Sequence, residues 1–297
     1  MEGRVKKKLH IPLYAIIALI VLTIYSLVML LPIFWVLMNS IKDRLAFRAS
    51  PFGWPKEYLF SNYALAFKEL TVTVPNSRTG LRDIKMFEMV GYSLLYSIGG
   101  IFVSLTVKCV TAYVVAKYPQ YRITKVVYAL VIFTMIFPVI GALPSQLYMA
   151  RTLHIYDNIA GMWIMGGNFL GLNFLILYSA FKGVSWEYAE AAQIDGASHF
   201  GIFIRIMLPF ISGTLFALGL LAFIGAWNDY TTPMIFLPSY PTIAYGLFSF
   251  MRSTSTVASS VTLHFTACML VMLPTLVLYL VFRNRLIGTM SVGGLKG

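Results

Sequence analysis

Long runs of apolar residues dominate this chain of 297 residues and constrain its fold more than any other feature. The hydrocarbon core of a bilayer is about 30 Å thick, and a helix of roughly 20 predominantly apolar residues crosses it. Hydrophobic residues make up 59% of the chain and charged residues 11%, whereas soluble domains contain roughly 45–50% and about 25%. A water-soluble fold of this length cannot bury so much apolar surface. The sequence therefore predicts an all-α integral membrane protein.

Six apolar runs are long enough to be transmembrane helices, and they lie at residues 11–38, 89–116, 126–150, 158–181, 204–227 and 257–282. An even number of spans places both termini on the same side of the membrane. Loops rich in Lys and Arg stay in the cytoplasm, and such residues flank the spans on the side of the termini: Arg4, Lys6, Lys7, Lys8, Lys117, Arg122, Lys125, Arg283 and Arg285. We therefore expect cytoplasmic termini, and the net charge of +12 reflects orientation, not nucleic-acid binding.

The spans divide the chain into three regions. Residues 1–88 hold the first transmembrane helix, which is too long for a cleaved secretory signal, and an extracytoplasmic loop at 39–88. Residues 89–282 form the transmembrane core, and residues 283–297 form a cytoplasmic tail. The aromatic, turn-rich stretch 51–55 in the loop predicts a segment that covers the membrane surface, with ligand contact as the alternative.

A short polar segment between the fourth and fifth spans has the pattern of a surface helix. Ser185 can cap its start, Glu187 suits the positive end of the helix dipole, and Gly196 suits a left-handed stop. Glu187 and Glu190 share one face, and the alanines that follow leave the helix thin. A helix this short is unstable alone in water, so docking in a groove of a partner is one interpretation. An ordinary amphipathic connector is the other.

The spacing within this segment resembles a known motif. Glu190-Ala191-Ala192, then three residues, Gly196, nine residues, Ile206, one residue and Leu208-Pro209 is similar to the EAA loop of bacterial ABC importer permeases, at about 186–209 here. The resemblance implies that this helix couples to a separate ATP-binding subunit. It assigns that role to Glu190, Ala191, Ala192 and Gly196, with Glu187, Asp195 and Ala197 as neighbours in the same segment. It also implies that Ile206, Leu208 and Pro209 begin the next helix as structural residues.

Further short matches resemble the smaller permease subunit of maltose-type carbohydrate importers. They are Asn62-Tyr63, Ala112-Tyr113, Ala116 to Tyr118, Trp227 to Asp229 and the tail Gly293 to Gly297. The resemblance implies a multi-pass protein of the bacterial cytoplasmic membrane that transports a sugar or oligosaccharide. It also implies a second homologous permease, two ATP-binding subunits and an extracytoplasmic solute-binding protein as partners. The tail is expected either to reach the ATP-binding subunits or to be a solvated terminus.

Several polar residues lie within or beside the apolar runs. Asn168, Asn173, Asn228 and Asp229 are candidates for a substrate pathway, with hydrogen bonding between helices as the alternative. Lys108 is expected to extend its side chain to the cytoplasmic interface, with a substrate role as the alternative. Gly167 and Gly171 form a GxxxG pair that permits close helix packing, and Pro138, Pro144 and Pro274 are expected to bend their helices.

Enzymatic and cofactor chemistry find little support. The chain has no phosphate-binding G-x-x-x-x-G-K-[ST] motif, so ATP and Mg are expected on the partner subunits and no cofactor on this chain. His10, His154, His199 and His264 lack metal-ligand spacing, and Cys109 and Cys268 lie in apolar runs. The main rival function is an ion-coupled secondary transporter, and a membrane-embedded enzyme ranks below it. Such a transporter needs an ion site near the midplane, for which only Asp229 is a candidate.

Overall fold

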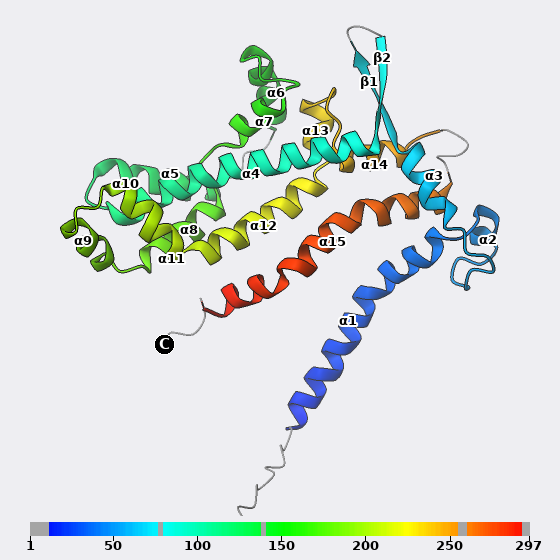
Figure 1. The fold of residues 1–297 in the computed structure, drawn as a ribbon, viewed down its shortest axis with the longest axis horizontal. Coiled ribbons are helices and arrows are strands. Elements are labelled where there is room, and N and C mark those ends of the chain that lie inside the picture. Colours follow the sequence, from blue (N-terminus) through cyan, green and yellow to red (C-terminus); the bar gives the residue numbers. More distant parts are fainter. Residues whose placement is uncertain (1–11, 77–79, 138–140, 255–259, 293–297) are drawn as a thin grey trace, which may run out of the picture. The chain divides into compact units, whose positions relative to one another are not determined.

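The computed structural model of the chain describes residues 12–76, 80–137, 141–254 and 260–292, and it is mostly helical (Figure 1). In chain order the elements are α1 (Leu13–Ser40), α2 (Arg44–Ala49), α3 (Ser61–Glu69), β1 (Thr71–Asn76), β2 (Gly80–Lys85), α4 (Met86–Lys117), α5 (Arg122–Ile136), α6 (Leu143–Thr152), α7 (Ile159–Gly166), α8 (Leu172–Lys182), α9 (Glu187–Ile194), α10 (His199–Ile202), the π-helix η1 (Phe203–Met207), α11 (Leu208–Phe210), α12 (Ser212–Asn228), α13 (Thr231–Phe236), α14 (Ile243–Met251) and α15 (Val261–Val292). The expected tail residues Gly293 to Gly297, and Pro138, lie outside the described residues.

Three helices are each long and apolar enough to cross a membrane. They are α1, α4 and the stretch Val261–Arg283 of α15. A fourth crossing results if His199–Phe210 and Ser212–Asn228, which are bent by 75°, count as one span. The described residues therefore contain helices of the length and apolar composition that a membrane protein requires, as the sequence predicted. The predicted runs 126–150, 158–181 and 204–227 are not continuous helices.

A proline and a glycine interrupt the third predicted span. The helix α5 ends at Ile136, and α6 begins at Leu143 with Pro144 in its first turn. Proline lacks a backbone N–H and has a φ angle suited to the start of a helix, so Pro144 favours a new helix that begins at Leu143. Gly141, just before α6, has φ +76°. The expected bend at Pro144 is thus a complete break.

The fourth predicted span is broken between α7 and α8. Gly167 follows the end of α7, and Gly171 has φ +97°, which is left-handed backbone that favours glycine. The two glycines therefore do not share a helix face as a GxxxG pair requires. Gly167 still permits close packing, because a Cβ there would lie 2.9 Å from Cγ1 of Val103 in α4.

A two-stranded antiparallel hairpin departs from the all-helical expectation. It pairs β1 with β2 in a register from Thr71 opposite Lys85 to Asn76 opposite Gly80. The alternating sequence Thr71-Val72-Thr73-Val74 buries both valines on one face, and alternation of this kind is the signal of a half-buried strand. This part of the predicted extracytoplasmic loop therefore has regular structure.

The described residues form two compact units. The first comprises those of Met1–Glu69 and Thr254–Leu270, and the second those of Leu70–Ser253 and Val271–Gly297. In the first unit, Lys42 is 2% exposed, and its Nζ donates to the carbonyls of Ser50 (3.0 Å) and Gly53 (2.6 Å). Burial lowers the pKa of Lys42. The turn-rich stretch 51–55 is thus tied to the end of α1.

In the second unit α4 is the central helix and packs against α7, α8 and α12 (Figure 1). Its C-terminal half contributes Ala112 and Tyr113 to an apolar core that also contains Phe174 and Phe181 from α8. The Tyr113 ring lies 4.8 Å from the ring of Phe203 in η1. This core joins the membrane-spanning helix α4 to the segment with the EAA spacing.

Candidate functional site

The helix α9 has the boundaries that its sequence predicts, with a glycine stop. Gly196 has φ +83°. Its N–H donates to the Gln193 carbonyl at 3.0 Å, and the Ala197 N–H donates to the Ala192 carbonyl at 2.9 Å. These two bonds form a Schellman motif, which satisfies the last carbonyls of a helix. At the other end the Ser185 hydroxyl accepts from the Glu187 N–H at 3.3 Å, although the N-cap residue is Trp186.

One face of α9 is anchored in the apolar core. Ala189 is fully buried there, and Trp186 and Ala192 pack against the same core. The Tyr188 ring lies 4.9 Å from the ring of Phe210 in α11. Because alanines carry this face, the helix backbone approaches the core closely.

The opposite face of α9 is exposed and mixes acidic with apolar groups. Of the seven residues predicted for coupling, Ala192 is half-buried, and the exposed ones are Glu187, Glu190, Ala191, Asp195, Gly196 and Ala197. Ile194 is 88% exposed and Phe200 is 74% exposed, and the sequence reasoning did not single out either residue. Ile194 lies four residues after Glu190, so helical spacing places the two on one face. That spacing was the available signal.

The segment after α9 contains a π-helix and a sharp bend. The Ser198 hydroxyl accepts from the Gly201 N–H at 3.2 Å and caps α10. In η1 the Leu208 N–H donates to the Phe203 carbonyl, five residues earlier. Pro209 has no N–H to extend this ladder, and α12 begins only at Ser212. Leu208 and Pro209 thus begin the short helix α11, whereas Ile206 lies in η1, and all three residues precede the 75° bend before α12.

Three contacts connect this segment to the C-terminal end of α4. The Lys117 ammonium donates to the Val184 carbonyl, just before α9. The Tyr118 hydroxyl lies 3.2 Å from His199 Nδ1, and its ring lies 5.7 Å from the Trp186 ring. A displacement of α9 would therefore act on the end of α4.

The four polar residues predicted for a substrate pathway do not gather in one place. Asn228 is exposed and donates to the Ile224 carbonyl of its own helix at 2.8 Å. Asp229 accepts from the Tyr96 hydroxyl at 3.2 Å and from the Thr232 N–H at 3.0 Å. The Asn168 side chain accepts from the Leu170 N–H at 3.1 Å. Of the four, only Asn173 lines the polar cavity described next.

A polar cavity of about 210 Å³ lies among α4, α7, α8 and α12. Its lining combines small and aromatic residues with hydrogen-bonding groups: Tyr96, Ser97, Gly100, Ile101, Ser104, Leu105, Met162, Trp163, Gly166, Asn173, Ala222 and Ala226. Gly99 admits the Trp163 ring beside α4, since a Cβ at this position would collide with the indole. The two glycines at 99 and 100 therefore make room for this site.

Lys108 lies next to this cavity, and its side chain is buried. It is 8% exposed, and its Nζ donates to Ser104 Oγ at 2.7 Å and to the Asn168 carbonyl at 2.8 Å. Ser104 is one turn closer to the start of α4, so the side chain extends away from the Lys117 end. The expected extension to the cytoplasmic interface is wrong. The break between α7 and α8 frees the Asn168 carbonyl as an acceptor inside the bundle.

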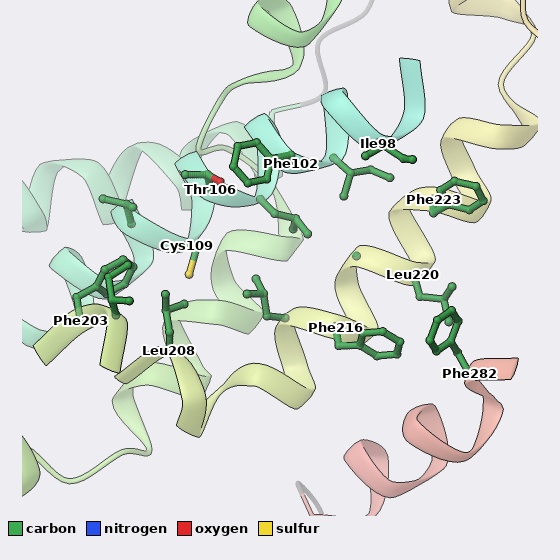
Figure 2. A pocket seen from close by; sticks show the side chains of 16 residues that line it. Ile98, Phe102, Thr106, Cys109, Phe203, Leu208, Phe216, Leu220, Phe223 and Phe282 are labelled. Atoms are coloured by element: carbon green, nitrogen blue, oxygen red, sulfur yellow. The ribbon is translucent and has the colours of Figure 1, made fainter. Parts of the chain in front are cut away.

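A larger cavity of about 670 Å³ is almost entirely apolar (Figure 2). Phe102 and Cys109 come from α4, Phe216 and Phe223 from α12, and Phe282 from α15. Thr106 supplies the hydroxyl among its lining residues. Since a saccharide requires many hydrogen-bond partners, this cavity does not suit one.

In the described residues no group of three or more His, Cys, Asp or Glu side chains could hold a metal ion.

Comparison with known proteins decides the family. The model of the binding-protein-dependent transport system inner membrane component matches residues 108–289, more than half of the chain. The chain belongs to this family. The match includes α9, η1 and most of the helices around both cavities.

Curated proteins similar to this permease family member are transport permeases, and two of the three described here match over nearly its whole length. The chain is 25% identical to the diacetylchitobiose uptake system permease protein NgcG of Streptomyces coelicolor, over 94% of this chain and 88% of that protein. It is 22% identical to the probable starch degradation products transport system permease protein AmyC of Thermoanaerobacterium thermosulfurigenes, over 98% and 99%. It is 30% identical to the maltodextrin transport system permease protein MdxG of Bacillus subtilis, over 61% and 66%.

A solved structure shares the fold of this permease. It is a bacterial ABC transporter involved in the import of the acidic polysaccharide alginate, with a TM-score of 0.75, 24% identity and coverage of 91% of this chain and 95% of that one. The chain is therefore an inner-membrane permease subunit of the ABC importer type, as its EAA spacing predicted. It is a transport subunit and not an enzyme.

Proposed function

We propose that this permease carries a sugar or oligosaccharide across the bacterial cytoplasmic membrane, driven by ATP hydrolysis in separate subunits. Its relatives are named for diacetylchitobiose, starch degradation products and maltodextrin. The proposal that transport is driven by ATP rests on the exposed face of α9. This helix has the EAA spacing and is followed by the left-handed Gly196. Two ATP-binding subunits hold ATP and Mg, and this chain binds no cofactor itself.

The exposed residues of α9 are the proposed contact with an ATP-binding subunit. They are Glu187, Glu190, Ala191, Asp195, Gly196 and Ala197, with Ala192 set closer to the core. Ile194 and Phe200 add apolar surface beside them, and exposed apolar surface rimmed by polar groups is typical of an interaction site. Beside them lies a hollow of about 580 Å³ that is lined by Gly196, Ser198 and Arg205 among others.

The coupling mechanism follows from the contacts of α9. When ATP draws the two nucleotide-binding subunits together, they displace α9, and the bonds from Lys117 and Tyr118 pass that displacement to α4. The permease and a second, homologous permease then open outward to receive the saccharide from an extracytoplasmic solute-binding protein. Hydrolysis restores the inward-facing state. In this scheme the two permeases together enclose the path of the saccharide.

The proposed topology has six spans with both termini in the cytoplasm. Two of the spans are then the broken pairs α5–α6 and α7–α8, and a third is the bent pair that ends in α12. Irregular backbone at membrane depth is tolerated where it is buried in protein or lines a cavity. The region 1–88 supplies the first span and the extracytoplasmic loop, 89–282 the transmembrane core and 283–297 the cytoplasmic tail.

Charge reversal on α9 tests the coupling role. Glu190→Lys places a positive charge on the proposed docking face, and we expect ATP-dependent saccharide uptake into vesicles to fall about tenfold or more, which corresponds to about 1.4 kcal/mol of lost docking. The measurement is uptake by the assembled transporter of whichever labelled saccharide the native protein imports, from a set of maltotriose, diacetylchitobiose and an acidic oligosaccharide such as oligogalacturonate.

The matched control is Glu57→Lys, which reverses an exposed charge in the predicted extracytoplasmic loop. It should leave uptake unchanged at equal expression. Unchanged uptake in Glu190→Lys would contradict the coupling role. Uptake that persists without any ATP-binding subunit and follows an ion gradient would replace the whole proposal with the secondary-transporter alternative.

A further inference from the structure

The polar cavity beside α4 contains hydrogen-bond donors that have no partner among the residues that the structure describes. Ser97 is 0% exposed, lines the cavity, and its Oγ has no hydrogen-bond partner. The indole N–H of Trp163, another residue of the lining, also has none among the described residues. Leaving a buried polar group unpaired costs about 1–3 kcal/mol. Two such groups at one cavity indicate that a bound molecule supplies the missing acceptors.

The buried positive charge of Lys108 lies next to the same cavity, because it donates to the lining residue Ser104. The Lys108 ammonium is held by Ser104 Oγ and by the Asn168 carbonyl, which are neutral groups. Among the described residues neither hydrogen-bond partner of Lys108 is a carboxylate, and the ion pair between Arg82 and Glu88 does not involve it. A buried charge is ordinarily paired.

The hydrogen bond from Lys108 also orients Ser104. Because the Ser104 oxygen accepts from the ammonium, its own O–H is free to donate, and Ser104 lines the cavity. Asn173, in the first turn of the 11-residue helix α8, adds an amide and the positive end of the helix dipole. Donors and positive charge thus outnumber acceptors at this end of the site.

A negative charge, that of Asp229, borders the lining through Tyr96, and like Lys108 it is hydrogen-bonded by neutral groups. Its two oxygens accept from the Tyr96 hydroxyl and the Thr232 N–H. Tyr96 and Ser104 are eight residues apart on α4, which is about 12 Å along a helix. Asp229 therefore borders one end of the cavity and Lys108 the other.

We propose that this cavity binds an oxyanion substituent, a carboxylate or a sulfonate, on one unit of the transported saccharide. The inference rests on the proposed function and names its substrate class as acidic saccharides. Lys108 supplies the charge, Ser97, Ser104 and Trp163 donate hydrogen bonds, and Asn173 holds the sugar. A cavity of about 210 Å³ has the volume of about seven liquid water molecules and is smaller than the usual pockets of 300–1,000 Å³. It therefore takes one saccharide unit.

Binding to the assembled transporter in nanodiscs, without the solute-binding protein, tests this inference. Calorimetric titration compares two matched pairs, D-galacturonate with D-galactose and sulfoquinovose with D-glucose. We expect at least one acidic sugar to bind about tenfold more tightly than its neutral counterpart, and the pair that shows the difference identifies carboxylate or sulfonate. Equal affinities within both pairs, or no binding of either acid, would overturn the inference.

Two substitutions assign the binding to this cavity. Lys108→Met keeps the length of the side chain and removes the charge, so it should abolish the preference for the acidic sugar, a loss of about tenfold. Ser97→Ala removes one donor and should weaken the same binding about threefold to tenfold. The control Lys125→Met removes an exposed charge from α5 and should leave both affinities unchanged. A Lys108→Met protein that assembles normally and keeps the preference would also overturn the inference.

Failure of this inference is distinguishable from failure of the proposed function. If ATP-driven uptake of maltotriose or diacetylchitobiose proceeds and Lys108→Met leaves the affinities unchanged, the cavity does not recognise acidic sugars and the permease still transports sugar. If no saccharide, neutral or acidic, is imported with ATP, the proposed function itself is wrong.

Discussion

At the scale of single residues, the two buried lysines show that the surrounding structure decides where a charged side chain points. Lys108 and Lys42 are both buried, and both donate to groups whose ordinary helical or strand partners are missing. The sequence identifies each as a charged residue near an apolar run. The acceptors come from segments whose fold is not regular, so the direction of each side chain could not be read from helical spacing.

Removal of the Lys42 ammonium should destabilise the first unit. Lys42→Met retains the apolar stem but leaves the Ser50 and Gly53 carbonyls without their donor. We expect a loss of about 1–3 kcal/mol of stability, since hydrogen bonds from charged groups contribute about this much. Thermal unfolding of the purified protein measures it, together with faster proteolysis within residues 50–55.

The control for this change is Lys56→Met, an exposed lysine in the same loop. It should leave the unfolding temperature and the cleavage rate unchanged. Equal behaviour of the two variants would show that the carbonyl contacts of Lys42 contribute nothing measurable.

At the scale of elements, α9 was the most predictable part of the candidate site. Its expected limits of about 186–196 compare with Glu187–Ile194 and a left-handed Gly196. A cap, a glycine stop and a motif spacing are local features, and local features determine short helices well. The polar cavity was not predictable, because four elements supply its lining, and Asn173 alone was named for a pathway in advance.

Close packing of α4 against α7 depends on Gly99. In Gly99→Leu the new side chain would collide with the Trp163 ring, and overpacking of this kind costs about 1–3 kcal/mol. We expect a lower unfolding temperature and loss of the polar cavity. Gly91→Leu is the matched control. Gly91 lies on the same helix, and a Cβ at this position would meet no other atom within 4 Å.

Both substitutions replace glycine by a better helix former and gain about 0.5–1 kcal/mol in propensity. Their difference therefore isolates the packing term. If Gly99→Leu were as stable as Gly91→Leu, the tight approach of Trp163 to α4 would not exist in the folded protein.

At the scale of the whole molecule, the six-span topology is testable by labelling single cysteines that are introduced after the two natural cysteines have been replaced. Both cysteines are free, and Cys109 is buried. In a background of Cys109→Ala and Cys268→Ala, a membrane-impermeant maleimide should label Glu57→Cys from outside intact cells and Asp195→Cys only after permeabilisation. Both positions are exposed, so the side of the membrane decides the labelling. Outside labelling of Asp195→Cys would contradict the proposed orientation.

The sequence by itself determined the membrane class, the apolar content of the spans and the position and ends of α9. These properties depend on composition and on residues within a few positions of one another. They also sufficed to predict the family, which the match over residues 108–289 then established.

Only the tertiary structure decided where the third, fourth and fifth predicted spans break, and what the freed groups then bind. Lys108 turns toward Asn168, sixty residues away along the chain, because the gap between α7 and α8 leaves that carbonyl without a helical partner. Ser97 and Trp163 line one cavity, and Gly99 lets the indole approach α4. Such pairings depend on backbone breaks and on distant segments that meet in space, and hydropathy and motif spacing contain no information about either.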